Sequence, residues 1–283
     1  FLYLNLPLHF GIFAFYLWRI SSTAVSPYEI AGMTLSAGII CGAIGINVAH
    51  ELGHRDTWYE QLMAKTLLLS SLYMHFFIEH NRGHHKNVST EEDPASARFG
   101  ENVYAFFYRS VTQSYLDAWK LEADRLVREQ KSVVGIYNEM IWYQLIQLAY
   151  LSLIFIFFGK IPLLCSIAAA IIGFLLLELI NYIEHYGLSR RKLSNGRYEN
   201  VLPLHSWNSN HELGRIFLYE LTRHSDHHYK ATRKYQILRH FDESPQLLHG
   251  YPASMLMALV PPLWFSVMNK EVLAWRKNLP TIS

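Results

Sequence analysis

Residues 28–54 read YEIAGMTLSAGIICGAIGINVAHELGH. The part from Tyr28 to Ala49 is about as long as the ~20 apolar residues that an α-helix needs to cross a bilayer. It runs directly into His50 and His54, whose spacing of four places both side chains on one face of a helix. This one stretch therefore predicts a membrane-spanning helix that ends in a pair of imidazoles.

Three further apolar segments have a similar length, and they are Phe1 to Ile20, Glu139 to Phe158 and Ile161 to Ile183. Short links at Ser21 to Pro27 and at Gly159-Lys160 join the four segments into two antiparallel hairpins. The predicted fold class is all-α, a polytopic membrane helix bundle with a cytoplasmic histidine-rich catalytic cap. We expect residues 1–283 to form a single membrane-embedded catalytic domain.

Two apolar segments, Leu62 to Ile78 and Ser254 to Met268, are shorter than a full span and are expected to be interfacial or re-entrant. The chain also opens without Met in the middle of an apolar run, so we expect an N-terminal portion to be missing.

Composition excludes several classes of protein. The 283 residues are 51% hydrophobic and carry a net charge of only +2, which gives no reason to expect nucleic acid as a partner. The two cysteines, Cys41 and Cys165, form no CxxC motif, so neither a disulfide framework nor a cysteine metal site is expected.

The distribution of cations predicts the orientation of the hairpins. Of the 25 Lys and Arg residues, only Arg19 and Lys160 fall at the two short links. By the positive-inside rule, the hairpin tips face outward and the long segments face the cytoplasm.

Nine of the 15 histidines sit in clusters or at the ends of spans, namely His50, His54, His80, His84, His85, His185, His224, His227 and His228. Spacings of three and four predict that each cluster presents its imidazoles in one direction. They can all meet at the cytoplasmic side only if Leu62 to Ile78 does not cross the membrane, because a crossing would move His80 roughly 30 Å away.

The clusters favour a metal centre over isolated histidines. His50-Glu51-Leu52-Gly53-His54 fits H-E-x-x-H, the zinc-binding motif of metalloproteases. A catalytic zinc takes only three protein ligands, however, so nine imidazoles indicate two metals. Imidazole also suits copper, iron and nickel, and an all-histidine or nearly all-histidine pair of irons fits this set best.

Acidic residues lie beside the histidines and are candidates to orient the imidazoles from behind, namely Glu51, Glu79, Glu184 and Asp226. Ordinary solvated carboxylates at helix ends are an equally good interpretation of these four residues.

Five motifs carry a more specific resemblance. They read HELGHR, EHNRGHHKNVSTEEDPASAR, NYIEHYGLSRR, HSWNSNHE and LTRHSDHHYKATRKYQILR. In this order they resemble the bacterial membrane alkane monooxygenases, the alkane ω-hydroxylases, which are relatives of the membrane fatty-acid desaturases and hydroxylases. The similarity extends to about Pro252, and NYIEHYG and HSWNSNH separate this branch from the desaturases.

The resemblance implies a non-haem di-iron enzyme of the bacterial inner membrane. Such an enzyme inserts one atom of O₂ into the terminal methyl of an alkane, with two irons as cofactor. Its electrons come from rubredoxin, a separate protein or a removed fusion partner, which an NAD(P)H-dependent reductase reduces. Carried over motif by motif, the nine histidines above are the iron ligands, and no separate acid or base is assigned.

Two departures from the family pattern are visible. The family has six transmembrane helices, so two N-terminal helices are expected to be missing here. The last motif reads LTRHSDHHY where the common form is LQRHSDHHA, and neither Thr222 nor Tyr229 is an expected ligand.

An alkane has no polar group, so its binding free energy must come from burial of its apolar surface, at about 25 cal/mol per Å². Candidate lining residues lie on the spans that end at His50 and His185, namely Ile39, Ile40, Ile44, Leu176, Leu179 and Ile180. Plain helix packing or lipid contact is the competing interpretation of each of them.

Basic residues are candidates to dock an acidic electron carrier, namely Arg190, Arg191, Lys192, Arg233 and Lys234. The competing interpretation is that these charges only fix the membrane topology.

Three other functions remain open. A zinc intramembrane protease would need a downstream aspartate in an apolar helix, and the sequence has none. A membrane desaturase or fatty-acid hydroxylase would share the metal chemistry. A metal transporter would need polar groups deep within the spans.

Overall fold

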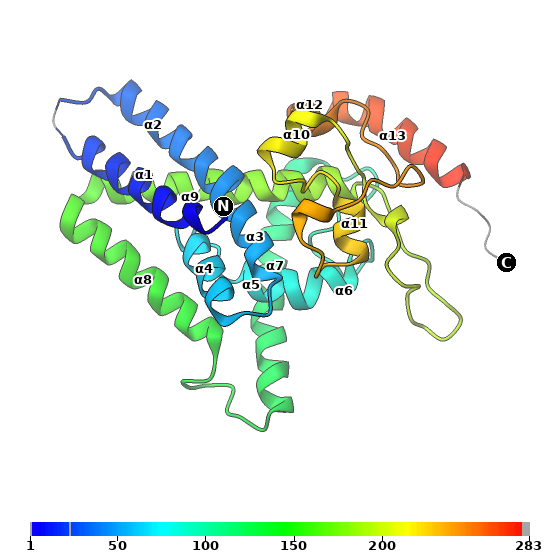
Figure 1. Ribbon diagram of the computed structural model, residues 1–283, viewed down its shortest axis with the longest axis horizontal. Helices are drawn as coiled ribbons and strands as arrows, with labels where there is room; N and C mark the ends of the chain where they lie inside the picture. The colour runs from blue at the N-terminus through cyan, green and yellow to red at the C-terminus, as the bar shows by residue number, and fades with distance from the viewer. Residues whose placement is uncertain (1, 23, 279–283) are drawn as a thin grey trace. The chain divides into compact units, whose positions relative to one another are not determined.

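The computed structural model describes residues 2–22 and 24–278, which form helices joined by turns and two isolated bridges (Figure 1). The chain divides into two compact units. Unit 1 comprises Phe1–Gly83 and Ser114–Leu177, and unit 2 comprises His84–Gln113 and Glu178–Ser283. The all-helical fold class predicted from the sequence is confirmed over the described residues.

The helices of unit 1 are α1 (Asn5–Ile20), α2 (Pro27–Ile40), α3 (Asn47–Gly53), α4 (Trp58–Leu69), α5 (Phe76–Glu79) and α8 (Glu139–Phe158). Those of unit 2 are α6 (His85–Asn87), α10 (Glu212–Phe217), α11 (His224–Tyr229), α12 (Gly250–Ala258) and α13 (Pro261–Asn278). Two long helices contribute residues to both units, α7 (Val103–Arg128) and α9 (Lys160–His185).

Five short segments complete the helical elements. Three are 3₁₀ turns, η1 (Leu2–Leu4), η4 (Pro203–His205) and η5 (Tyr235–Ile237). The other two are π-helical, η2 (Cys41–Ile46) and η3 (His80–His84). Both π segments directly precede or contain predicted metal ligands, which is where such turns often occur in enzymes.

Among the residues that the structure describes, three helices are long and apolar enough to cross a membrane, and they are Pro27–Gly53, Glu139–Phe158 and Lys160–His185. The first of these consists of α2, η2 and α3 in one continuous run. Helices of this length and composition are those of a membrane protein. Helix α1 has 16 residues, or about 24 Å at 1.5 Å per residue, so the fourth predicted span stays a prediction.

Local sequence explains where these helices begin and end. Ser26 and Glu29 form a capping box ahead of Pro27, which is well suited to the first turn of a helix. The Asn138 side chain accepts hydrogen bonds from the first turn of α8. Gly159, at φ +88°, ends α8 in a conformation that favours glycine, and α9 begins at the next residue.

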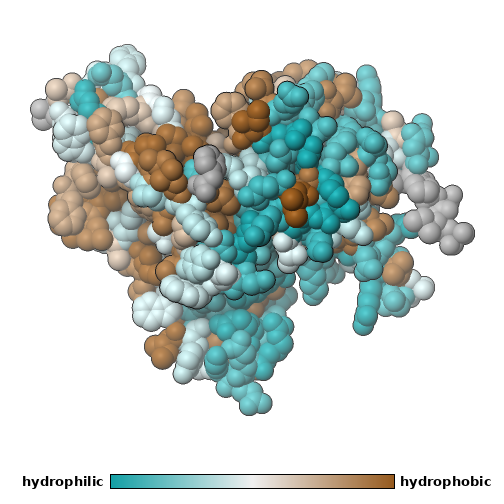
Figure 2. Space-filling view, in the orientation of Figure 1, coloured by the Kyte–Doolittle hydropathy of each residue, from teal (hydrophilic) through white to brown (hydrophobic). Residues whose placement is uncertain are grey.

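Within unit 1, α2 and η2 pack closely against α9 at small residues. A Cβ added to Gly42 would lie 2.8 Å from the Gly173 carbonyl oxygen, and one added to Gly173 would lie 2.9 Å from the Cys41 Cβ. Small residues at such crossings let backbones approach, which is how helices associate in lipid. Large apolar side chains on α8 and α1 instead point outward, and Figure 2 shows this surface in brown.

The two short apolar segments are interrupted in the structure. Leu62 to Ile78 is divided between the 12-residue α4 and the four-residue α5, and neither reaches the ~20 residues of a span. Ser254 to Met268 is divided between α12 and α13. Their interfacial or re-entrant placement remains a prediction.

Unit 2 has an aromatic core around the last turns of α9. Tyr182 and Tyr186 pack against Trp264, and all three are buried. The Trp207 indole donates a hydrogen bond of 2.9 Å to the Tyr186 carbonyl. This core fixes the end of α9, where Glu184 and His185 lie.

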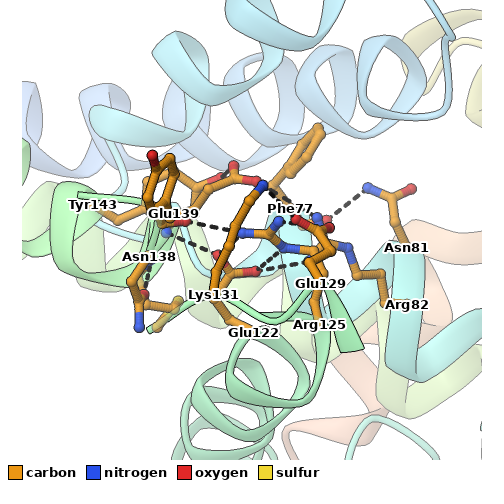
Figure 3. A network of polar contacts seen from close by, with 12 residues as sticks. Phe77, Asn81, Arg82, Glu122, Arg125, Glu129, Lys131, Asn138, Glu139 and Tyr143 are labelled. Atoms are coloured by element: carbon orange, nitrogen blue, oxygen red, sulfur yellow. Dashed lines mark hydrogen bonds and ion pairs between the residues drawn. The ribbon is translucent and has the colours of Figure 1, made fainter. Parts of the chain in front are cut away.

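Unit 1 contains a network of charged side chains around Glu122 of α7 (Figure 3). Its fully buried carboxylate accepts hydrogen bonds from Arg82 at 2.9 Å, from Arg125 at 2.6 Å and from the Glu139 backbone at 2.9 Å. Because Arg82 belongs to η3 and Glu139 begins α8, this carboxylate ties the segment carrying His80 to the ends of α7 and α8.

Candidate metal centre

Four histidines of unit 2 converge on one point, and they are His84, His185, His224 and His228. One ring nitrogen from each lies within 4.8 Å of all the others, and all four residues are buried. The Nε2 atom of His224 lies 2.8 Å from that of His228 and 3.2 Å from that of His185. The Nε2 atoms of His84 and His228 are 3.2 Å apart. We call this set the four-histidine cluster.

Three different elements supply these rings. His84 closes the π-helical segment η3, and His185 is the last residue of α9. His224 and His228 are four residues apart on α11, which places both on one face. The cluster therefore unites motifs that lie up to 144 residues apart in the sequence.

The donor set fits a transition metal ion. Two nitrogens bound at about 2.1 Å to one ion lie no more than about 4.2 Å apart, and the three Nε2–Nε2 separations of 2.8 to 3.2 Å given above lie within this limit. Burial lowers the pKa of His228 well below its usual value, and the neighbouring histidines lower it further. The ring is therefore neutral, as a metal ligand must be.

Asp93 holds His84 from behind. Its Oδ2 lies 2.9 Å from His84 Nδ1 and accepts a hydrogen bond of 2.5 Å from the Ser96 hydroxyl. This contact places the ring proton on Nδ1 and leaves Nε2 to face the cluster, the usual arrangement of a metal-binding histidine. Burial raises the pKa of Asp93, but the His84 and Ser96 contacts outweigh it and the net shift is downward.

Sequence reasoning missed Asp93. It lies nine residues after His84 in STEEDPASAR, beside the exposed Glu91 and Glu92. The one available signal was its place directly before Pro94, where the backbone is restricted and turns are common. Its neighbours carry the same charge, so composition alone does not distinguish it.

Glu184 contacts the cluster at His224. Its Oε2 lies 3.0 Å from His224 Nε2, and its Oε1 accepts a hydrogen bond of 2.7 Å from the Tyr251 hydroxyl. All three side chains are buried. Of the four acidic residues predicted to orient imidazoles, Glu184 thus contacts the four-histidine cluster, and it does so at the Nε2 atom of His224.

Asp226 lies on α11 between the cluster histidines, but its carboxylate is bound by arginines. Arg233 and Arg239 both pair with it, and the Arg239 guanidinium reaches Oδ1 at 3.0 Å. Burial raises the pKa of Asp226, while hydrogen bonds from these two arginines lower it below its usual range. Asp226 thus anchors α11 to the loop that follows it.

Three more of the predicted ligands gather in unit 1. The Nε2 atom of His54 lies 3.4 Å from that of His50 and 3.2 Å from that of His80. His50 and His54 come from the end of the first long span, and His80 opens η3. Three converging imidazoles again form a donor set of the kind that metals require.

The last two predicted ligands pair within unit 2. His85 Nε2 and His227 Nε2 are 3.1 Å apart. His84 and His85 are thus members of different sets, although they are adjacent in the sequence. Adjacent residues on a helix point about 100° apart, so the expectation that each motif presents all its imidazoles in one direction is wrong for these two.

The other predicted residues are placed as follows. Glu51 is buried and pairs with Arg55, and Glu79 is buried. Leu179 and Ile180 lie in the unit 2 core, whereas Ile39 is 46% exposed. Ile40, Ile44 and Leu176 are half-buried. Their proposed contacts with substrate remain predictions.

We expect Asp93→Asn to weaken metal binding by about tenfold, within the 10- to 100-fold range typical of partners behind a ligand. Asparagine keeps the oxygen that accepts a hydrogen bond from the Ala95 backbone at 3.1 Å, but removes the charge facing His84. Metal retained per chain against increasing chelator would measure this effect. The exposed neighbour provides the control Glu92→Gln, and equal retention in the two variants would contradict the role of Asp93.

Comparison with known proteins agrees with this geometry. The family model described as fatty acid desaturase matches residues 27–257. Alkane 1-monooxygenase 2 of Pseudomonas aeruginosa is 47% identical over 244 residues, which are 86% of this chain and 65% of that protein. Alkane 1-monooxygenase of Pseudomonas putida is 42% identical over 273 residues, which are 96% and 68% of the two chains.

A more distant relative is the xylene/toluene monooxygenase hydroxylase component XylM of Pseudomonas putida. It is 30% identical over 283 residues, which are 99% of this chain and 75% of that protein. The chain spans 65% of the length of the first Pseudomonas aeruginosa relative. It therefore belongs to the fatty acid desaturase family, in the group of the alkane 1-monooxygenases.

Proposed function

We propose that the protein is a non-haem di-iron monooxygenase that hydroxylates the terminal methyl of alkanes to primary alcohols. One oxygen atom of O₂ enters the C–H bond, and the other leaves as water with two electrons and two protons. The observation that carries this proposal is the buried four-histidine cluster in a chain 47% identical to an alkane 1-monooxygenase.

All nine histidines predicted from the sequence serve as iron ligands in this proposal. The four-histidine cluster of unit 2 would hold one iron. The other five histidines keep the role of candidate iron ligands that the sequence predicts for them. When bound, the irons supply the redox chemistry that activates O₂, which protein side chains do not provide. The part of the protein is to hold neutral imidazoles with Nε2 facing the ions.

Neighbouring acidic side chains assist in that task. Asp93 contacts His84 at Nδ1, behind the ring, and so fixes its tautomer. The Glu184 carboxylate, which Tyr251 holds in place, contacts His224 at Nε2, the atom that faces the cluster. Ligands held in place would also set the position of the metals, and therefore the position at which a substrate carbon can react. Positioning of this kind sets terminal selectivity, because weaker internal C–H bonds would otherwise react first.

The remaining parts of the proposal concern substrate, partner and location. The alkane enters a slot between spans from the lipid and is bound by burial of its chain. Rubredoxin, reduced by an NAD(P)H-dependent reductase, delivers the electrons. The protein lies in the inner membrane with its metal centre toward the cytoplasm, as the distribution of Lys and Arg favours.

Two measurements test this function. Purified protein should contain two irons and negligible zinc per chain by mass spectrometry, and with reduced rubredoxin it should convert octane to 1-octanol. One zinc without iron would instead favour a protease, provided the metal had not exchanged. An unsaturated product from a fatty acyl substrate would favour a desaturase. Toluene is the competing substrate to include, because one relative is a xylene/toluene monooxygenase component.

A further inference from the structure

Unit 2 contains a cavity of about 610 Å³ whose lining is cationic. Its charged lining residues are Arg98, Arg190, Lys192, Arg276 and Glu91, so four cations face one carboxylate. Arg98, Lys192 and Arg276 are exposed, so the cavity opens to solvent. We call it the cationic cavity.

Hydrogen bonds to backbone carbonyls hold two of the arginines in the walls of this cavity. Arg190 donates to the Lys86 carbonyl at 2.8 Å and to the Glu199 carbonyl at 2.8 Å. Arg276 donates to the Gly187 carbonyl at 2.7 Å and lies over the Phe99 ring. These bonds connect the segment after His85, the loop after α9 (yellow-green in Figure 1) and the end of α13.

The floor of the cavity leads to the four-histidine cluster. Ser89 and Ser96 both line the cavity, and the Ser89 backbone donates to the Ser96 hydroxyl at 2.7 Å. That hydroxyl donates to Asp93 at 2.5 Å, and Asp93 lies 2.9 Å from His84. Two hydrogen bonds therefore connect Ser96, a buried residue of the cavity lining, to a proposed iron ligand.

We propose that the cationic cavity is the docking site of the acidic electron-carrier protein, and that electrons reach the metal centre by way of Ser96, Asp93 and His84. This inference rests on the proposed function and adds the location of the partner. Each docked carrier is oxidised by one electron, and two successive carriers supply the two electrons of a turnover.

The chemistry of the site favours an acidic protein over an anionic lipid. Its cations come from three separate segments, at Arg98, at Arg190 with Lys192, and at Arg276, and a protein surface can engage such a spread through several carboxylates. A hydrogen-bonded route from the cavity to the cluster would not strengthen the binding of a lipid headgroup. The same route would speed electron transfer from a docked donor, because the rate of electron tunnelling falls steeply with distance.

The test uses the full chain with Arg98→Glu and Lys192→Glu combined, since neither side chain belongs to the hydrogen-bonded wall described above. A matched control reverses Lys120 and Lys270, which are exposed and do not line the cavity. Rubredoxin binding is measured directly by calorimetry in neutral detergent, and KM for reduced rubredoxin is measured in octane turnover. Single turnover after dithionite reduction reports the chemistry without the carrier.

We expect the Arg98/Lys192 variant to raise Kd and KM for rubredoxin by about tenfold or more, as loss of steering charges does. Its dithionite single turnover should be unchanged, and the control variant should bind normally. The parent should also lose affinity with rising salt, and the variant less so.

Three results would overturn the docking site: normal rubredoxin binding by the Arg98/Lys192 variant, weakened binding by the Lys120/Lys270 control instead, or a defect confined to association with phosphatidylglycerol vesicles. A different pattern would separate this inference from the proposed function. Rubredoxin binding that depends on Arg98 and Lys192, with no 1-octanol formed even after dithionite reduction, would support the docking site and refute alkane hydroxylation.

Discussion

Replacing His224 by alanine should abolish most of the proposed hydroxylation and remove one of the two proposed metals per chain. The Nε2 atom of His224 lies within 3.2 Å of the corresponding atoms of both His185 and His228. The substitution therefore removes a central nitrogen ligand from the four-histidine cluster. Mutating a residue that hydrogen-bonds to a metal ligand typically lowers metal affinity or activity 10- to 100-fold. Loss of the ligand itself should therefore lower activity by more than about 100-fold. Octane turnover and metal content on the same preparation would measure both effects.

The control for this substitution is His249→Ala, because His249 is exposed and belongs to none of the histidine sets. It should retain metal and activity. Full hydroxylase activity of His224→Ala with normal iron content would show that the ligand assignment is wrong. A loss of activity without a loss of metal would instead indicate that His224 acts on substrate or oxygen.

The second large effect is expected on stability, from Glu122→Ala in unit 1. The side chain of Glu122 is 0% exposed, and it pairs with Arg82 and Arg125, which are 32% and 21% exposed. Removing one partner from a buried ion pair costs about 3–5 kcal/mol. We expect about 3 kcal/mol, at the low end of that range, because both arginines keep some contact with solvent.

Thermal unfolding of the protein in detergent would measure this loss, with the exposed residue of the same helix providing the control Asp124→Ala. Equal midpoints for the two variants would contradict the stabilising role of Glu122. Metal content measured at low temperature separates a folding defect from a metal-binding defect.

The same carboxylate predicts the pH dependence of stability. Burial raises the pKa of Glu122. Hydrogen bonds from Arg125, the Glu139 backbone and Arg82 lower this pKa by more than burial raises it, so the pKa lies below its usual value. Its contribution is therefore complete above the pKa of an unfolded glutamate and is lost as the pH falls toward the depressed pKa. In Glu122→Ala, this part of the acid sensitivity should disappear.

The sequence predicted the long apolar helices well, because length and hydropathy are local properties, whereas the more polar 26-residue α7 was not predicted. The spans expected at 28–49, 139–158 and 161–183 correspond to helices at Pro27–Gly53, Glu139–Phe158 and Lys160–His185. The π turns at Cys41–Ile46 and His80–His84 were not predicted. One extra residue per turn leaves no signature in composition, since it depends on how the helix packs.

For the candidate site, the histidine spacings identified the residue type and the motifs, but not how the rings are shared. His84 and His85 separate into different sets, and so do His227 and His228. Asp93 was missed because its role depends on a turn that brings it back to His84. Both facts depend on tertiary structure, which spacing along one helix does not encode.

The π turns also restrict which insertions and deletions the chain can tolerate. A π turn contains one residue more than an α turn, so deleting any single residue from Cys41–Ile46 would allow the segment to rewind as α-helix. Everything after it on that helix would then rotate by about 100°, turning His50 and His54 away from their present direction. The number of residues in this segment is thus as important as their identity, and an alignment gap placed there would mark a relative whose first histidine pair points elsewhere.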